Sequence, residues 1–128
     1  MSYYISRTVA GPFDAVVRRV TEVLKQEGFG VLTEIDVQAT LKAKLGADVA
    51  PYRILGACNP SFAHQALQLE TRLGVLLPCN VIVRDAGGGQ TEVASVDPVS
   101  SMERTGNVRL GSIALQVRER LQKAIDSL

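Results

Sequence analysis

The chain has 128 residues, of which 46% are hydrophobic and 21% are charged. These values exclude an intrinsically disordered chain, and the length is close to the usual size of one domain, so we expect a single domain over residues 1–128. The formal net charge of +1 argues against nucleic acid as a partner, because no strong positive field would attract phosphate groups.

The sequence shows no targeting or membrane segment. Its first residues lack the basic stretch and apolar run of a secretory signal, and no apolar segment approaches the ~18 residues of a membrane span. We therefore expect a cytoplasmic protein without a membrane partner. Two cysteines do not make a disulfide framework, and in a reducing cytoplasm both should be free thiols.

The amino-terminal part predicts a strand followed by a long helix. Residues 3–9 are rich in aromatic and β-branched side chains, which is typical of a strand. Pro12 suits the first turn of a helix, and apolar residues then recur at three- and four-residue spacing until Gly28 ends the helix.

Residues 30–37 alternate between apolar and polar side chains, as in a half-buried strand. The alternation predicts that one face carries Val31, Thr33, Ile35 and Val37. Glu34 and Asp36 would share the other face, where they could form an acid–base pair or a hard-metal site. No third acidic side chain lies nearby in the sequence, so a solvated sheet face is the favoured interpretation.

A short helix is predicted over residues 38–45 and should end at Gly46. We expect Leu41 and Leu45 to point inward from it.

The middle of the chain predicts a strand, a helix and a second strand. The first strand covers residues 52–58, and its small residues Gly56 and Ala57 suggest that another backbone or a ligand comes close. Asn59 is a good N-cap for the helix that follows, and the next strand covers residues 79–84.

The last part predicts a hairpin and a long helix. The glycine-rich residues 85–90 favour a hairpin turn into a strand over 91–96, and Ser100 with Glu103 resembles a capping box. A final helix near residues 107–127 would bury a stripe formed by Val108, Leu110, Ile113, Ala114, Val117, Leu121, Ile125 and Leu128. The predicted fold class is therefore α+β, with one mainly antiparallel five-stranded sheet and two long helices on one face.

Both cysteines flank the middle helix, and they define the candidate site Cys58, Asn59, Cys79 and Asn80. If the two strands are antiparallel neighbours, both thiols lie at one edge of the sheet; a parallel crossover would place them at opposite ends. The free amides of the helix favour a thiolate at Cys58. Simple packing of both cysteines as small hydrophobic residues remains the main alternative to a functional site.

Several segments together resemble the bacterial and archaeal family known as domain of unknown function 302. The resemblance lies in Tyr-Arg-Ile-Leu-Gly-Ala-Cys-Asn-Pro (52–60), Leu-Leu-Pro-Cys-Asn-Val-Ile-Val (76–83), Val-Asp-Pro (96–98), Gly-Phe-Gly-Val (28–31) and Glu-Ile-Asp-Val (34–37). It implies a small α+β fold similar to the TATA-binding-protein-like arrangement, often found as a homodimer. The family has no settled activity, and His64 departs from its pattern.

Three classes of function remain open from the sequence. The first is a binding protein for a small molecule or a soft metal ion such as Cu(I), because two thiols do not complete a structural zinc site. The second is a homodimeric interaction module in which the cysteines only pack. An enzyme ranks last: no general base accompanies either cysteine, and the single histidine, His64, is predicted to face solvent. We predict no catalytic residues, metal ligands or cofactor.

Overall fold

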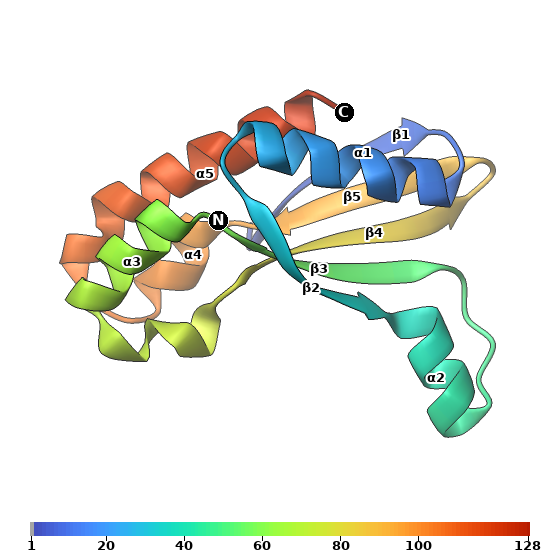
Figure 1. Ribbon diagram of the computed structural model, residues 1–128, viewed down its shortest axis with the longest axis horizontal. Helices are drawn as coiled ribbons and strands as arrows, with labels where there is room; N and C mark the ends of the chain where they lie inside the picture. The colour runs from blue at the N-terminus through green and yellow to red at the C-terminus, as the bar shows by residue number, and fades with distance from the viewer. Residues whose placement is uncertain (1) are drawn as a thin grey trace.

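The computed structural model describes residues 2–128 and contains one five-stranded sheet in the order β1-β5-β4-β3-β2, with every neighbouring pair antiparallel (Figure 1). The strands are β1 (Tyr4–Ala10), β2 (Gly30–Asp36), β3 (Tyr52–Cys58), β4 (Cys79–Gly87) and β5 (Gln90–Val96). The helices are α1 (Phe13–Gln26), α2 (Val37–Leu45), α3 (Pro60–Leu69), α4 (Pro98–Glu103) and α5 (Gly111–Asp126), with 3₁₀ turns η1 (Thr71–Leu76) and η2 (Val108–Leu110). The predicted α+β class and the antiparallel five-stranded sheet are confirmed, whereas the TATA-binding-protein-like arrangement stays a prediction.

The two edges of the sheet come from consecutive strands. β1 and β2 form the opposite edges, and α1 crosses the sheet to connect them. β3, β4 and β5 fill the centre as neighbours. The first strand therefore pairs with the last, so that Tyr4 lies opposite Val96.

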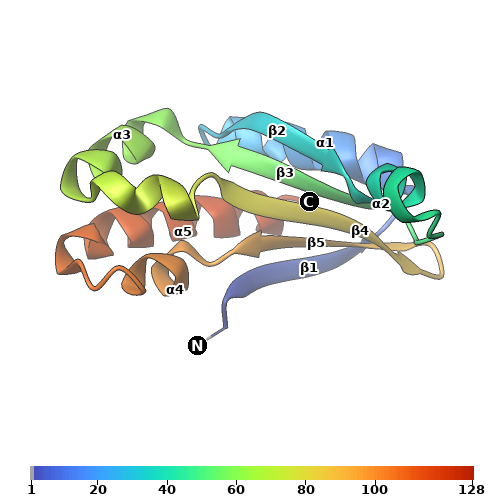
Figure 2. The same cartoon turned by 90° about the horizontal axis from the view of Figure 1, so that it is seen from below.

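The two long helices lie side by side on one face of the sheet, as predicted (Figures 1 and 2). Their apolar stripes and the inward side chains of the strands leave water together, which is the main source of stability for such a layered fold. The most buried core side chains include Val20, Leu24, Leu55, Val81, Val83, Val93, Leu110 and Leu121.

The other face of the sheet carries no helix layer, and Figure 2 looks onto it. We call it the open face and define it by Tyr4, Ile35, Tyr52, Ile54, Ile82 and Ala94. Ile35 is 47% exposed and Tyr4 is 44% exposed. Each of the five strands thus contributes at least one apolar side chain to the open face, beside polar ones such as Arg84 and Glu92.

A β-bulge in β2 changes which side chains share a face. Val31 pairs with Ala57 and Thr33 pairs with Gly56, so Leu32 is an extra residue between them. Thr33 and Ile35 share the open face, but the prediction that Val31 and Val37 join them is wrong, because the extra residue puts Val31 on the covered face and Val37 begins α2.

The bulge turns two acidic side chains toward the helices. Glu34 and Asp36 pair with Leu55 and Arg53 of β3, whose side chains point to the covered face. Arg53 donates to Glu34 at 2.7 Å and lies 3.6 Å from Asp36, and its guanidinium lies over the ring of Phe13. Both carboxylates are also solvated, as predicted, because the side chains of Glu34 and Asp36 are 48% and 42% exposed.

Helix α2 stands apart from the core. The Asp36 side chain caps its first turn through the amide of Ala39 at 2.9 Å, and Gly46 ends it with a positive φ of 68°. All nine of its residues are at least partly exposed, and Leu45 is 75% exposed. The prediction that Leu45 packs inward is wrong, because α2 extends past the end of the sheet, whereas Leu41 is half-buried (Figure 1).

Two further details near the carboxyl end differ from the sequence prediction. Asp97 accepts a hydrogen bond from the amide of Val99 at 3.0 Å and caps α4, so the capping box predicted at Ser100 is wrong. Val108 is 92% exposed and does not belong to the buried stripe, whereas Leu110 of the same turn η2 is 1% exposed and does.

No helix formed by residues 2–128 has both the length and the apolar character needed to cross a membrane.

Candidate ligand cavity at the two cysteines

The connection from β3 to β4 decides where the two thiols lie. Although α3 and η1 intervene, the two strands are antiparallel neighbours, and Ala57 lies opposite Cys79 in their register. Cys58 follows Ala57 and is therefore diagonal to Cys79. Of the two arrangements open from the sequence, the structure has the one that brings both cysteines to the same end of the sheet.

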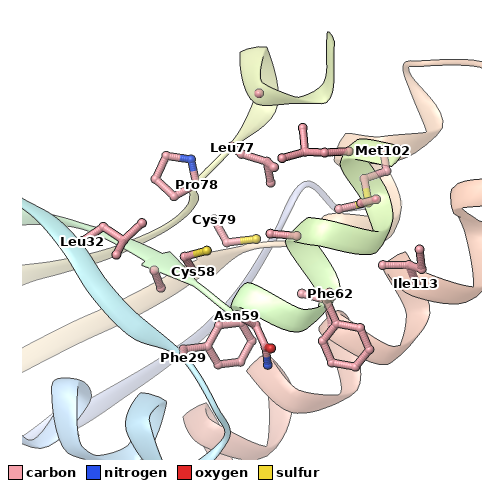
Figure 3. A pocket seen from close by; sticks show the side chains of 16 residues that line it. Phe29, Leu32, Cys58, Asn59, Phe62, Leu77, Pro78, Cys79, Met102 and Ile113 are labelled. Atoms are coloured by element: carbon pink, nitrogen blue, oxygen red, sulfur yellow. The ribbon is translucent and has the colours of Figure 1, made fainter. Parts of the chain in front are cut away.

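Both cysteines line a cavity of about 310 Å³ where the sheet meets α3, α4 and α5 (Figure 3). We call it the thiol cavity. Its wall is mostly apolar and is formed in large part by Phe29, Phe62, Leu77, Met102, Ile113 and Val117. Leu32, which is 66% exposed, also lines the cavity and marks where it reaches the surface.

Cys58 reaches the cavity because it ends its strand. Regular alternation puts Ala57 on the covered face and Cys58 on the other. However, Cys58 is the last residue of β3, and the chain turns at Asn59 to begin α3. Figure 3 shows the sulfur of Cys58 beside Cys79, on the side toward Leu32.

Cys79 is a buried and uncharged thiol. It is 7% exposed, and its burial, with a smaller contribution from nearby Cys58, raises its pKa from 9.0 to about 11. At neutral pH it therefore keeps its proton. A thiol in this state is a poor nucleophile, which argues against Cys79 as a catalytic residue.

Asn59 supplies the amide group of the cavity wall. It occupies the N-cap position of α3, but its Nδ2 donates to the carbonyl oxygen of Glu27 at 3.4 Å. Asn59 is thus the N-cap residue, as predicted, but its side chain makes no capping hydrogen bond. The bond to Glu27 connects the start of α3 to the end of α1, and it requires a close approach, since a Cβ on Gly28 would lie 3.1 Å from Asn59 Nδ2.

Asn80 lies away from the other three predicted site residues. It pairs with Gly56 and faces the open face, where it lines a shallow hollow of about 600 Å³. The structure thus brings Cys58, Asn59 and Cys79 together and places Asn80 on the other side of the sheet. His64 is exposed, as predicted, and its Nε2 lies 3.2 Å from Nε2 of Gln68.

The small residue Gly56 is explained by neighbouring side chains. A Cβ at this position would clash with Thr33 Oγ1 and would lie 2.8 Å from Pro78 Cγ. The close approach predicted from the sequence is therefore real, and protein side chains make it. Gly56 allows β2 and the start of β4 to pack tightly beside the thiol cavity.

Sequence reasoning missed most of the cavity wall. Phe29, Met102, Ile113 and Val117 come from segments far from the cysteines, and their periodicity indicated only burial. A stripe of apolar side chains does not reveal that helices leave a gap between them. Among residues 2–128, no group of three or more histidine, cysteine, aspartate or glutamate side chains is placed to hold a metal ion.

Comparisons with known proteins agree with this architecture. The model of the family described as domain of unknown function DUF302 matches residues 5–128. An uncharacterized conserved protein DUF302 from Bacillus stearothermophilus, known from a crystal structure, is 31% identical, with 98% of each chain covered and a TM-score of 0.91. No curated protein matches the chain. The chain therefore belongs to the DUF302 family, a domain of unknown function.

Proposed function

We propose that the protein binds a small, uncharged and mainly apolar molecule in the thiol cavity. The observation that carries this proposal is the cavity itself, because about 310 Å³ falls at the lower end of the range of small-molecule sites. Aromatic and aliphatic side chains provide most of the contact surface. Asn59 and the two thiols are the polar groups available to orient a ligand.

The charge of the wall favours an uncharged ligand. The sixteen described residues that line the cavity include no acidic or basic side chain, and Cys79 keeps its proton at neutral pH. A charged ligand would lose its hydration without gaining an ionic partner. Aromatic rings or short hydrocarbon chains with one hydrogen-bonding group fit this environment best.

A soft metal ion is the weaker form of the same proposal. Two thiols provide ligands for Cu(I), but a metal must displace the proton of each thiol that it binds. The raised pKa of Cys79, about 11 against 9.0, opposes the loss of its proton and therefore disfavours metal binding at neutral pH. An apolar molecule does not meet this penalty.

The test is to fill the cavity and measure the binding of an apolar fluorescent probe, 8-anilinonaphthalene-1-sulfonate, together with a neutral analogue, N-phenyl-1-naphthylamine. Ala63 lines the cavity, so Ala63→Leu should weaken binding of the neutral probe about tenfold or more. Ala43→Leu adds the same side chain to exposed α2 and should change nothing. Equal affinities for the two variants would refute the proposal, and tighter binding of the anionic probe would contradict the uncharged ligand.

A homodimer through the open face is a second proposal. Its apolar side chains, among them Ile35, Ile54 and Ile82, need a covering surface. Five strands of about seven residues span roughly 24 Å by 24 Å, which is of the order of the ~800 Å² that each partner contributes to a standard interface. The ion pair Arg84–Glu92, 2.6 Å, lies on the same face. Two such pairs related by a two-fold axis can exchange partners, so the face is complementary to a second copy.

Light scattering at tens of micromolar tests this second proposal. The wild type should have twice the mass of one chain, and Ile82→Lys on the open face should give a monomer. Leu115→Lys is the matched control, because Leu115 is 50% exposed on α5 and lies outside the open face. A wild-type protein with the mass of one chain would remove the proposal.

We also infer a cytoplasmic location. Cys58 and Cys79 are both free thiols although they line one cavity, which suits a reducing compartment.

A further inference from the structure

We propose that Cys58 and Cys79 form a reversible disulfide when the protein meets a hydroperoxide, and that this bond closes part of the thiol cavity. The first statement goes beyond ligand binding. The second rests on the proposed function, because a closed cavity matters only if the open one binds a molecule.

The register of β3 and β4 sets the separation of the two residues. Ala57 and Cys79 are direct partners, and Cys58 is one position further along the strand. A spacing of ~5 Å between strands and ~3.4 Å along a strand puts the two Cα atoms about 6 Å apart. Disulfides join Cα atoms about 4.4–6.8 Å apart, so the backbone spacing of this pair fits a disulfide, and the bond further requires that the Cys58 side chain be directed toward Cys79.

The cavity provides the freedom that the bond requires. Both sulfurs lie at the same part of its wall, and neither is sealed inside solid packing (Figure 3). Cys58 also ends its strand, so its side chain is not fixed by a following strand residue. A change of side-chain rotamer toward Cys79 therefore needs space that the cavity already contains.

The two cysteines have different accessibility, which orders the reaction. Cys58 is half-buried and lies beside exposed Leu32 at the surface, whereas Cys79 is 7% exposed. Cys58 therefore meets the hydroperoxide first. The high pKa of Cys79 agrees with this order, because a protonated thiol does not attack a peroxide efficiently.

The chemistry balances with the hydroperoxide as the oxidant. The Cys58 thiolate attacks one peroxide oxygen, the O–O bond breaks, and the other oxygen leaves with a proton as water or an alcohol. The Cys58 sulfenic acid is the two-electron oxidised product. The sulfur of Cys79 then attacks that of Cys58, the S–O bond breaks, and the hydroxyl group leaves with the Cys79 proton as water. A dithiol reductant returns both thiols by exchange.

The bond should change the cavity. It brings the two sulfurs to about 2 Å from each other, at the wall of the cavity that both cysteines line. Their hydrogen-bonding capacity and part of the free volume are lost together. We expect the affinity for N-phenyl-1-naphthylamine to fall about fivefold or more on oxidation and to return on reduction.

The experiment treats the full chain with hydrogen peroxide and analyses a proteolytic digest by mass spectrometry without reduction. The expected product is a peptide linked through Cys58 and Cys79, about 2 Da lighter than the two reduced peptides together and separated by dithiothreitol. Cys79→Ala should instead retain a Cys58 sulfenic acid that reacts with dimedone. Cys58→Ala should give neither product, and circular dichroism checks that both variants fold.

Each outcome tests one part of the proposal. A wild-type protein that accumulates sulfenic or sulfinic acid at Cys58, or links only between chains, would overturn the disulfide. Unchanged probe affinity in the fully oxidised wild type would overturn the closing of the cavity while leaving the disulfide in place. If the reduced protein binds no probe, the proposed ligand function fails, and with it the closing of the cavity, yet the mass spectrum still decides the disulfide.

Discussion

Raising the pH above 9 should destabilise the protein through Cys79. In the unfolded chain this thiol has its ordinary pKa of 9.0, and in the folded protein burial raises the pKa to about 11. Below pH 9 both states hold the proton, so the contribution to stability is constant. Between pH 9 and 11 only the unfolded state loses the Cys79 proton, so the free energy of unfolding falls progressively.

The size of the effect follows from the two pKa values. The free energy of unfolding should fall by about 1.3 kcal/mol at pH 10 and by about 2.3 kcal/mol at pH 11, approaching about 2.7 kcal/mol above that. Cys79→Ala has no proton to lose and should lack this decline. Cys58→Ala should keep most of it, because burial is the larger cause of the shift and Cys58 the smaller.

Urea denaturation followed by circular dichroism at pH 8, 9 and 10, with a phosphine reductant and constant ionic strength, measures this. The wild type and Cys79→Ala share all other titrating groups, so their difference in unfolding free energy isolates Cys79. The free energy of unfolding of the wild type relative to that of Cys79→Ala should fall by about 1.3 kcal/mol between pH 8 and pH 10. If the two proteins lose stability in parallel, Cys79 is not the buried neutral thiol that we describe.

Three further substitutions test the packing and capping described above. Gly56→Ala should destabilise the protein by about 1–3 kcal/mol in urea denaturation, because a methyl group clashes with Thr33 and Pro78, whereas Gly74→Ala meets no atom within 4 Å and should be nearly neutral. Asp97→Ala should lower the free energy of unfolding by about 1–3 kcal/mol more than Asp48→Ala does. Asp97 is 3% exposed, caps α4 and pairs with Arg118 at 3.0 Å, whereas the ion pair of Asp48 with Lys42 is largely exposed. Equal losses of stability would contradict the capping role. Leu45→Lys should change the free energy of unfolding by less than about 0.5 kcal/mol, whereas Leu121→Ala in the core should lower it by about 2–5 kcal/mol. A large loss of stability in Leu45→Lys would show that Leu45 of α2 packs against another surface.

The sequence was sufficient to predict the layers of the fold. The stripes of α1 and α5 each require an apolar surface, and five segments of strand character provide one sheet. The apolar spacing of the last segment does not show where helix α5 begins. Val108, which this spacing places on the buried side, lies in the preceding turn η2 and is exposed.

The errors in β2 and α2 share one cause. A single extra residue, Leu32, reverses the alternation, and no residue type signals the bulge. Leu41 and Leu45 have the spacing of a buried helix face, but α2 continues beyond the sheet, so that Leu41 is only half-buried and Leu45 is exposed. Local patterns describe what a segment can bury, and only tertiary structure provides the partner.

The candidate site was only partly predictable for a similar reason. Proximity of Cys58 and Cys79 followed once β3 and β4 were taken as antiparallel neighbours, but the sequence equally allowed a parallel crossover. The alternation of the strand also predicts Asn80 on the face opposite Cys79, and the register of β3 and β4 agrees. The cavity could not be predicted, because it is a gap between α3, α4 and α5, and no residue pattern within a single helix indicates such a gap.

The placement of β1 has a consequence for how the chain is made. Tyr4 faces Val96, so the first strand to leave the ribosome has no neighbour until the last strand has also emerged. β3, β4 and β5 can pair in order during synthesis, but the edge formed by β1 must wait for them. During that interval α1 has only part of the surface that it finally covers. The amino-terminal strand therefore completes the sheet although it is synthesised first.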